Sequence, residues 1–510
     1  MEGELLVKIK RALVSVWDKT GLDELSEVFR DYGIEVISTG KTARVLRDLG
    51  VEVKDVSDWT GSPEILSGRV KTLHPKVHAG ILFRRKYPQD QEDLQRIGAL
   101  PIDLIVVNLY PFPEACRSGE KELVEFIDIG GPTLLRAGAK NFSWVTVISS
   151  PEDYPLLIKE LRANQGKVSL RFRKRMAGKV FSLTAKYDLW IAQSLFKEKV
   201  QFGDEMAFGL YKALDLRYGE NPHQLGGFYL PFGQELKFEK IQGKELSYNN
   251  LMDLSSAWEM VDWFSPQVCA VVVKHSNPCG LALGKDPAHA YRRAYQADPL
   301  SSFGGIIGIN AEVDRSCAKE ILKSGFRECV IAPSFSQDAL KEFSKKPNVR
   351  IMKIKKYSPS LPIRAVFNGY LLQEKDRLRL KESDLQVVSK KRPTKSQIRD
   401  LIFAFEVVRF VKSNAIVVAK GGQVLGVGAG QMSRVESVEI ALRKSGEKAR
   451  GAVLASDAFF PKTDNVELCA KAGIKAIIQP GGSKADPQVI ETADRYGIVL
   501  VFTSHRHFLH

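Results

Sequence analysis

The hydrophobic and polar positions of residues 1–200 alternate as successive strands and helices do. An apolar run at 11–17 precedes a helical pattern at 21–33 that ends in glycine, and a second apolar run at 34–38 precedes another helical pattern at 43–50. The nearly unbroken apolar run at 102–112 is typical of a strand covered on both faces. This alternation predicts βαβ units and a mostly parallel, doubly wound sheet, which binds ligands at the carboxyl ends of its strands.

A change of pattern predicts a domain boundary near Gly203. The helical pattern at 168–199 gives way there to a polar, turn-prone stretch. We therefore expect one domain over 1–203 and a second region over 204–510. Further apolar runs of this second region lie at 268–275, 416–430, 451–460, 474–480 and 498–505, the last three separated by helical patterns. They predict two α/β layers that split near 360–390.

The composition of the 510-residue chain excludes several classes of protein. A hydrophobic fraction of 44% excludes global disorder, and no stretch reaches the ~18 uncharged apolar residues of a membrane helix. The first residues lack the apolar run of a secretory signal, and the six scattered cysteines form no CxxC pair, so we expect a cytoplasmic location. A net charge of +15 favours anionic partners: phosphorylated metabolites, polyglutamates or nucleic acid.

Small polar residues follow the first two predicted strands and open the helices after them. They are Ser15, Lys19, Ser38, Thr39, Gly40 and Thr42. Free main-chain N–H groups and the positive end of a helix dipole make such a place suitable for a phosphate. Ordinary helix capping by hydroxyl residues explains the same pattern equally well.

The segment 67–82 concentrates positive charge. It contains Arg69, Lys71, His74, Lys76 and His78, and its proline and glycine predict a loop. Such a loop suits an anionic substrate, although a solvated basic loop remains the alternative. Two histidines four residues apart are weak evidence for zinc without a helix or an adjacent glutamate.

Proton-transfer groups gather in two further motifs. Tyr110 ends a predicted strand, and Asp128 precedes a Gly-Gly turn into a helix that carries Lys140. Lys274 and His275 end another apolar strand before a predicted tight turn at 277–280. Imidazole titrates near neutral pH, and lysine stabilises developing negative charge. Each of these residues could also be structural.

Zinc chemistry is not expected at the second of these motifs. Cys279 follows a proline, as in the PCxxC of zinc nucleoside deaminases, but the second cysteine and an HxE partner are missing. Further along, the glycine-rich stretch 426–434 predicts main chain opened for a ligand, with Arg434 free to bind a phosphate or carboxylate. The final segment 506–510 either frays or folds into a site.

Taken together, these segments carry a resemblance to a known family. VSVWDKTGL, VISTGKTARVLRDLG, SGRVKTLHPKVHAGIL, IDIGGPTLLRAGAKN, LRYGENPHQ, SYNNLMDLSSAW, VKHSNPCG, DPLSSFGG, VKSNAIVVAK, GAGQMSR, SDAFFPKTDN and RHFLH follow one another in this order. The chain resembles the bifunctional family that joins AICAR transformylase to IMP cyclohydrolase. The resemblance implies an N-terminal methylglyoxal-synthase-like domain and a C-terminal transformylase of two cytidine-deaminase-like α/β subdomains without catalytic zinc.

The resemblance also implies the reaction and its residues. A formyl group passes from 10-formyltetrahydrofolate, the cosubstrate, to the amino group of AICAR, and formyl-AICAR then loses water to close to IMP. His275 is implied as the general base and Lys274 as its assistant. The implied substrate-binding residues of the transformylase are Arg217, Tyr218, Asn249, Asn414, Arg434, Asp464, Phe508 and His510.

For ring closure the resemblance implies an acid–base set of Lys71, Tyr110, Asp128 and Lys140, with Lys140 paired to Asp128. The implied phosphate-binding residues are Ser15, Lys19, Ser38, Thr39, Gly40, Thr42, Arg69 and Thr72. Two positions depart from the common family pattern. Trp17 stands where relatives carry a small hydroxyl residue, so we expect it to reshape the phosphate pocket. Lys41 replaces a glycine and is a candidate phosphate contact. In the transformylase, the usual glycine-rich pattern is thinned at 367–376.

Partners are implied in the same way. The family is typically a homodimer that shares its transformylase site, it takes small-molecule substrates, and a monovalent cation is possible. We expect no nucleic acid and no membrane as partners. A nucleic-acid-binding protein, suggested by the charge, and a scaffold that has lost one activity are the alternatives that the motifs argue against.

Overall fold

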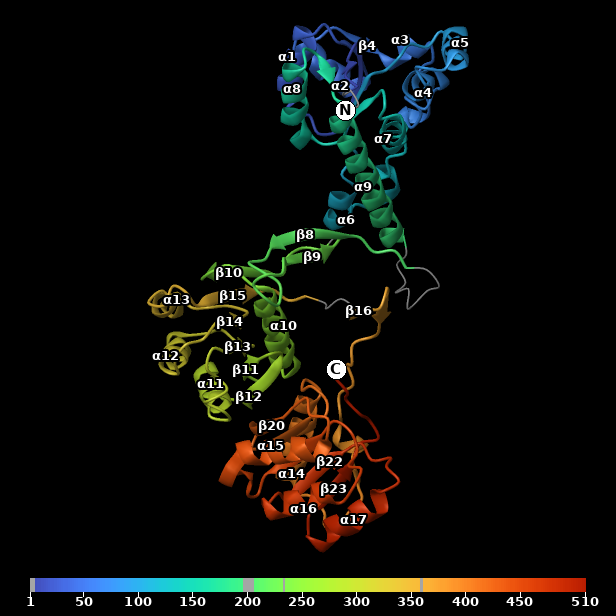
Figure 1. Cartoon of the computed structure of the whole chain (residues 1–510). Helices are drawn as coiled ribbons and strands as arrows, with labels where there is room; N and C mark the ends of the chain where they lie inside the picture. Colours follow the sequence, from blue (N-terminus) through green and yellow to red (C-terminus); the bar gives the residue numbers. More distant parts are fainter. Residues whose placement is uncertain (1–4, 196–205, 233, 358–360) are drawn as a thin grey trace. The chain divides into compact units, whose positions relative to one another are not determined.

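The computed structural model describes the chain except for residues 1–4, 196–205, 233 and 358–360 (Figure 1). The chain divides into two compact units. The N-terminal unit is Met1–Tyr211 with Pro231–Gln234, and the C-terminal unit is Lys212–Leu230 with Glu235–His510. The boundary expected near Gly203 lies outside the described residues.

A five-stranded parallel sheet forms the centre of the N-terminal unit. Its order is β4 (Val53–Asp55), β3 (Glu35–Ser38), β2 (Arg11–Ser15), β5 (Leu104–Val107) and β6 (Thr146–Ile148). The helices are α1 (Leu22–Asp31), α2 (Gly40–Asp48), α3 (Val56–Thr60), α4 (Pro75–Leu82), α5 (Pro88–Arg96), α6 (Phe112–Ser118), α7 (Gly130–Lys140), α8 (Tyr154–Ala163) and α9 (Leu170–Leu195). A small ribbon pairs β1 (Val7–Lys8) with β7 (Lys167–Val168). The parallel α/β sheet expected from the alternation is confirmed.

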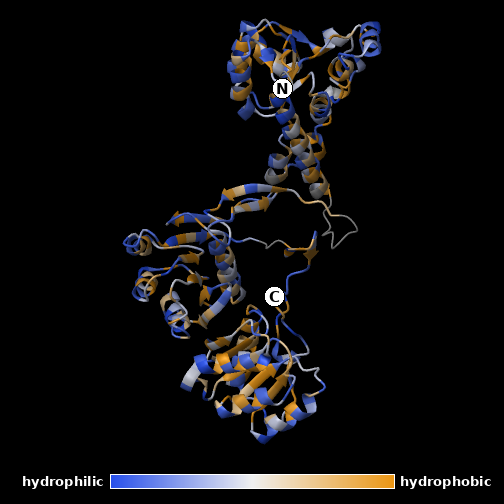
Figure 2. Ribbon diagram, in the orientation of Figure 1, coloured by the Kyte–Doolittle hydropathy of each residue, from blue (hydrophilic) through white to orange (hydrophobic). Residues whose placement is uncertain are grey.

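Both faces of this sheet are buried, which explains the unbroken apolar runs. Successive residues of a strand point to opposite faces. Ala12 and Val14 accordingly lie in a core with α1 and α8, whereas Leu13 lies in a second core with α4 and α7. In Figure 2 the strands of this unit carry hydrophobic colour, and the helices around them carry both hydrophobic and hydrophilic residues.

A twelve-stranded sheet runs through the C-terminal unit. Its order is β10 (Phe238–Gln242), β15 (Arg350–Ile354), β14 (Cys329–Ala332), β13 (Ile306–Ile309), β11 (Cys269–Lys274), β12 (Asn277–Leu283), β20 (Gln423–Gly428), β19 (Ile416–Lys420), β21 (Val453–Ser456), β22 (Ala476–Gln479), β23 (Val499–Phe502) and β18 (Gln386–Val387). The ribbons β8–β9 (Leu210–Asp215, Gly227–Pro231) and β16–β17 (Ile363–Val366, Gly369–Leu372) lie outside it.

The two halves of this sheet repeat one topology. Each half has, in chain order, an edge strand, a helix, a hairpin, and then three parallel strands separated by helices. The helices are α10 (Tyr248–Trp263), α11 (Pro287–Tyr295), α12 (Arg315–Lys323) and α13 (Gln337–Phe343), then α14 (Lys395–Val408), α15 (Arg434–Ser445), α16 (Asp464–Lys471) and α17 (Asp486–Arg495). The halves join where Ala282 of β12 pairs with Gln423 of β20.

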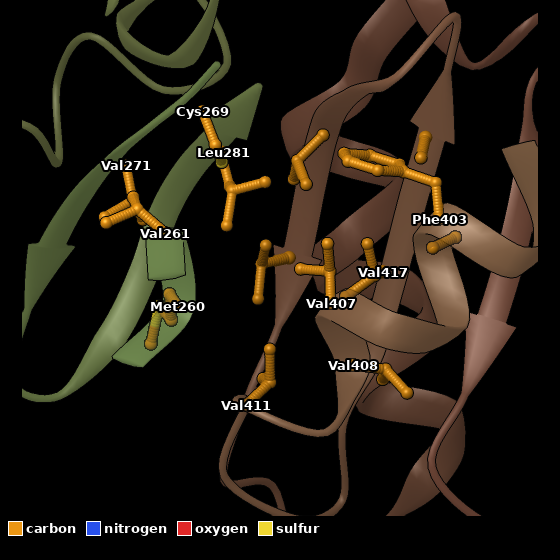
Figure 3. Close-up of a cluster of buried hydrophobic side chains, with 14 of the residues drawn as sticks. Met260, Val261, Cys269, Val271, Leu281, Phe403, Val407, Val408, Val411 and Val417 are labelled. Atoms are coloured by element: carbon orange, nitrogen blue, oxygen red, sulfur yellow. The ribbon is translucent and has the colours of Figure 1, made fainter. Parts of the chain in front are cut away.

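One core is shared by both halves. Met260 and Val261 of α10 lie in the same buried cluster as Phe403, Val407 and Val408 of α14 (Figure 3). The remaining helices of each half cover the opposite face of the sheet in separate cores. A continuous core and a continuous sheet therefore fix the two halves to each other, which places side chains from both halves around common surfaces.

Candidate functional site

The first candidate site lies where the order of the N-terminal sheet reverses. β2 and β5 are neighbours, but the chain leaves β2 toward β3 and leaves β5 toward β6. Parallel α/β sheets bind ligands outside the carboxyl ends of strands at such a point. Ser15 ends β2, and Asn108, Leu109 and Tyr110 follow β5 directly.

The hydroxyl residues here divide into two groups. The Ser15 and Thr39 hydroxyl oxygens lie 3.0 Å apart, and neither α1 nor α2 receives a side-chain cap, so helix capping does not explain these two residues. Ser38 is fully buried and donates to the Val14 carbonyl oxygen over 2.6 Å. Thr42 donates to the Val16 carbonyl oxygen over 3.0 Å. Ser38 and Thr42 therefore hold the loops, and only Ser15 and Thr39 keep a part-buried hydroxyl at the strand ends.

Positive charge approaches the same place from two segments. The Lys19 ammonium donates to the Trp17 carbonyl oxygen over 3.0 Å. The pKa of Lys19 is lowered, mainly by burial and further by the charge of Lys41, although the charge of Asp18 partly raises it. A Cβ at Gly40 would lie 3.8 Å from the Lys71 Nζ, so Lys71 reaches the first residue of α2.

The basic segment 67–82 is only partly the loop that its glycine and proline predict. Residues from Pro75 form α4, and His74 caps this helix by accepting a hydrogen bond from the Lys76 main chain over 3.2 Å. The His74 Nε2 contacts the Ser62 hydroxyl over 3.2 Å, and burial lowers the pKa of His78. The loop prediction is therefore wrong for the second half of the segment, because proline is well tolerated at the first position of a helix.

The two basic residues of this loop, Arg69 and Lys71, form ion pairs with glutamates. Lys71 pairs with Glu64 over 2.8 Å, and Arg69 pairs with Glu125. Thr72 is buried, and a Cβ at Gly130 would lie 3.3 Å from its hydroxyl oxygen. The loop thus touches the N-terminal ends of α2 and α7.

Asp128 sits directly before α7. Burial raises the pKa of its carboxyl group, while main-chain hydrogen bonds from Gly131 and Tyr110 lower it. The Gly131 bond measures 2.8 Å. A carboxyl group with a raised pKa suits proton transfer near neutral pH.

The expected pairing of Lys140 with Asp128 is wrong. Lys140 is the last residue of α7, and Asp128 precedes its first residue. A rise of 1.5 Å per residue separates the two ends of this helix by about 15 Å, beyond the reach of the two side chains. Lys140 is exposed at the far end.

One residue at this site, Asn108, was not singled out by the sequence motifs. Asn108 accepts from the Trp17 main chain over 2.6 Å and from the Asp18 main chain over 3.0 Å, and it donates to the Asp18 carbonyl oxygen. Trp17 itself packs on Tyr110 with ring centroids 5.0 Å apart, and both rings are exposed. The position of Asn108 directly after a buried strand was the signal that could have identified it.

The second candidate site begins at the hairpin between β11 and β12. Lys274 ends β11 and donates from Nζ to the Phe303 carbonyl oxygen over 3.1 Å. His275 and Ser276 form the turn, with φ of 52° and 58°. The tight turn expected at 277–280 is wrong, because these residues already belong to β12, which pairs with β11 from Asn277 onward.

This hairpin is bonded to the second half of the sheet. The Asn277 side chain accepts from the Lys412 main chain over 3.0 Å, two residues before Asn414. The Asn414 side chain accepts from Arg434 over 2.7 Å. The hairpin is therefore connected to Asn414 and Arg434 by one hydrogen bond to Lys412, the short segment 412–414 and one hydrogen bond from Arg434.

The glycine-rich stretch predicted a free Arg434, and this prediction is wrong because Arg434 pairs with Asp457. The Arg434 guanidinium is buried and pairs with Asp457, which is fully buried, and donates to the Ser456 hydroxyl over 2.8 Å. The glycine-rich stretch also contributes to helix packing. A Cβ at Gly428 would lie 1.9 Å from the Ser437 carbonyl oxygen, so glycine lets α15 pack closely on β20.

A cavity of about 750 Å³ lies beside Arg434. Four residues implied by the family resemblance line it: Asn414, Arg434, Asp464 and Phe508. Lys462 and Arg506 line it too and add positive charge that the motifs did not indicate. The cavity has the size and the mixed polar and apolar lining of a small-molecule site.

The end of the chain folds against this site, which decides between the two expectations for 506–510. His507 is buried, donates from its main chain to the Asp457 carbonyl oxygen over 3.0 Å, and contacts Asp376 with its Nδ1 over 2.5 Å. The main-chain oxygen of His510 accepts from Lys412 and Arg364, each over 2.7 Å.

The remaining implied residues of the transformylase form their own group. The Arg217 guanidinium lies 5.4 Å from the Tyr218 ring centroid, and Asn249 donates to the Glu220 carbonyl oxygen over 3.0 Å. Asn249 lies one helical turn before Asp253 on α10, and Asp253 accepts from the Ser276 main chain over 2.7 Å. This group is therefore adjacent to the His275 hairpin.

Comparisons with known proteins agree along the whole chain. A family model described as AICARFT/IMPCHase bienzyme matches residues 138–444, and one described as MGS-like domain matches 21–133. The bifunctional purine biosynthesis protein PurH of Aquifex aeolicus is 47% identical over 98% of this chain and 100% of its own. The chain belongs to the AICARFT/IMPCHase bienzyme family. The PurH proteins of Cyanothece sp. and Desulfitobacterium hafniense are both 48% identical over 98% of this chain, covering 99% and 100% of their own lengths.

Three further findings concern metal sites, membrane helices and a solved structure. Among the described residues, no three His, Cys, Asp or Glu side chains gather as a metal ion requires. In the same part of the chain, no helix combines the length and apolar character needed to cross a membrane. A crystal structure of ForH, 35% identical, covers 37% of this chain and 99% of its own with a TM-score of 0.33.

Proposed function

We propose that the two units of this bienzyme divide the last two steps of IMP synthesis. The C-terminal unit transfers a formyl group from 10-formyltetrahydrofolate to AICAR, and the N-terminal unit closes formyl-AICAR to IMP. One observation carries this proposal: each unit gathers its own set of the residues implied for one reaction. Lys274 and His275 lie in one unit, and Lys71, Tyr110 and Asp128 lie in the other.

In the formyl transfer, the amino group of AICAR attacks the formyl carbon and the bond from that carbon to N10 breaks. The amino group is a weak nucleophile because its lone pair is delocalised into the ring. His275 accepts the proton of the attacking nitrogen, and Lys274 stabilises the oxygen of the tetrahedral intermediate. The departing N10 takes up a proton. Arg434, held by Asp457, provides a fixed cation for AICAR in the adjacent cavity.

In the ring closure, the carboxamide nitrogen attacks the formyl carbon and water leaves. Asp128 accepts a proton from this nitrogen, because a buried carboxylate with a raised pKa is a stronger base than an exposed one. Lys71 and Tyr110 supply the proton that leaves with water. Ser15, Thr39 and Lys19 bind the phosphate at the ends of β2 and β3, beside the point between β2 and β5 where the sheet order reverses.

Three further assignments belong to this proposal. Arg217, Tyr218, Asn249, Asp464, Phe508 and His510 bind the transformylase substrates. The working molecule is a homodimer that takes small-molecule substrates, and a monovalent cation binds in the transformylase; light scattering and cation-dependent activity test these two points.

The decisive experiment incubates the protein with AICAR and 10-formyltetrahydrofolate and identifies the products by mass. IMP is the expected product. Lys274→Ala should abolish formyl-AICAR formation yet still convert added formyl-AICAR to IMP, and Lys71→Ala should accumulate formyl-AICAR. If both variants lost the same step, the division between the units would be refuted.

A further inference from the structure

The repeated topology of the C-terminal unit places two hairpins in equivalent positions. The β11–β12 hairpin turns at His275 and Ser276, and the β19–β20 hairpin turns at Gly421 and Gly422. All four residues have positive φ, between 52° and 67°. This conformation is available to glycine without strain, but a residue with a Cβ adopts it only when its surroundings hold it.

An aspartate from the preceding helix binds each turn. Asp253 is the sixth residue of α10, and Asp400 is the sixth residue of α14. Asp400 accepts from the Gly421 and Gly422 main chains over 2.9 and 3.0 Å. Asp253 accepts from the Ser276 main chain over 2.7 Å and from its hydroxyl over 3.3 Å.

The helices that carry these aspartates also begin alike. Ser247 and Asn250 form a reciprocal capping box at the start of α10, as Thr394 and Gln397 do at the start of α14. Such a box fixes the first turn of a helix. Each carboxylate is therefore presented to its hairpin from a rigid position.

We propose that Asp253 is the positioning residue for His275. The carboxylate of Asp253 holds Ser276, and the Asn277 side chain donates to the His275 carbonyl oxygen over 3.1 Å, so the main chain from which the His275 side chain projects is held in one conformation. Asp400 occupies the equivalent position but holds a glycine turn that needs no such support. The proposal rests on the proposed role of His275 in formyl transfer.

The test compares Asp253→Ala with Asp400→Ala in the full chain. Asp253→Ala should lower the transformylase kcat about 10- to 100-fold, the effect of losing a hydrogen bond to a charged group, with a much smaller change in the KM for AICAR. Asp400→Ala should leave this kcat within about 3-fold of the wild type. The cyclohydrolase rate on added formyl-AICAR should stay unchanged in both variants, because Asp253 and Asp400 lie in the other unit. Urea unfolding of the C-terminal unit serves as the folding control.

A second variant separates positioning from chemistry. Ser276→Gly in the Asp253→Ala background should recover most of the lost kcat, because glycine adopts the turn without the carboxylate. Asp253→Asn, which still offers an oxygen acceptor, should remain within about 10-fold of the wild type. Equal losses in Asp253→Ala and Asp400→Ala, or no recovery with glycine, would overturn the proposal. A wild-type protein that forms no formyl-AICAR would instead refute the proposed function.

Discussion

The buried pair of Arg434 and Asp457 allows a quantitative prediction. Their side chains are 6% and 0% exposed, and the Asp457 carboxylate also accepts from the Ser413 hydroxyl. Asp457→Ala leaves the guanidinium buried without its counter-charge, a change that costs about 3–5 kcal/mol in proteins. Arg434 keeps its bonds to Ser456 and Asn414, so we expect the lower end, about 3 kcal/mol.

Pulse proteolysis in urea measures this loss for the C-terminal unit. With an m-value of about 3 kcal/mol per molar urea, a loss of about 3 kcal/mol lowers the midpoint by about 1 M. Ser456→Ala removes an uncharged acceptor of the same guanidinium and the Ser456 hydrogen bond to the Ala458 carbonyl oxygen, and it should lower the midpoint by about half as much.

Asp457→Ala should also weaken AICAR binding, because Arg434 lines the cavity and loses its fixed orientation in this variant. The KM for AICAR should rise at least 10-fold, while ring closure of added formyl-AICAR stays unchanged. Equal midpoints for Asp457→Ala and Ser456→Ala, or an unchanged KM, would refute the argument that Asp457 holds Arg434 for binding.

Three shorter predictions concern other positions. Burial raises the pKa of Asp128, so this group stabilises the fold below its ordinary pKa and loses that contribution as pH rises through the higher folded value; Asp128→Asn should flatten this part of the pH–stability curve and abolish ring closure. Glu64→Gln frees Lys71 from its 2.8 Å ion pair, so the KM for formyl-AICAR should fall, and an increase would contradict competition between Glu64 and the substrate anion. Gly428→Ala places a Cβ 1.9 Å from a carbonyl oxygen of α15 and should destabilise the C-terminal unit by about 1–3 kcal/mol, measured by urea unfolding against Gly369→Ala in the exposed β17 ribbon.

Local patterns predicted much of this fold because the information they need is local. Apolar runs predicted the buried strands. Positions at the ends of these strands predicted Ser15, Tyr110 and Lys274 as candidate site residues. Contacts between distant segments were not predictable from such patterns. The predicted pairing of Lys140 with Asp128 is wrong because these two oppositely charged residues lie at opposite ends of α7, about 15 Å apart along the helix.

The glycine-rich stretch 426–434 shows a second limit. Glycine is equally suited to a ligand, a turn or a neighbouring helix, and the sequence does not say which. In the structure Gly428 leaves room for the Ser437 main chain. Arg434, which was predicted to be free, forms an ion pair with Asp457. The partner that decides each role lies outside the motif.

Asn108 and Asp457 show where site geometry is determined in both units. Each is a polar side chain just after a buried strand, and each binds groups from other segments: Asn108 binds the main chain at 17–18, and Asp457 binds Arg434 and Ser413. Asp457 is fully buried, and a buried polar group is costly unless it is bonded, so its partners are held firmly. Candidate ligand-binding residues can therefore be predicted from their chemistry, whereas the residues that orient them become recognisable only when the fold brings their partners together.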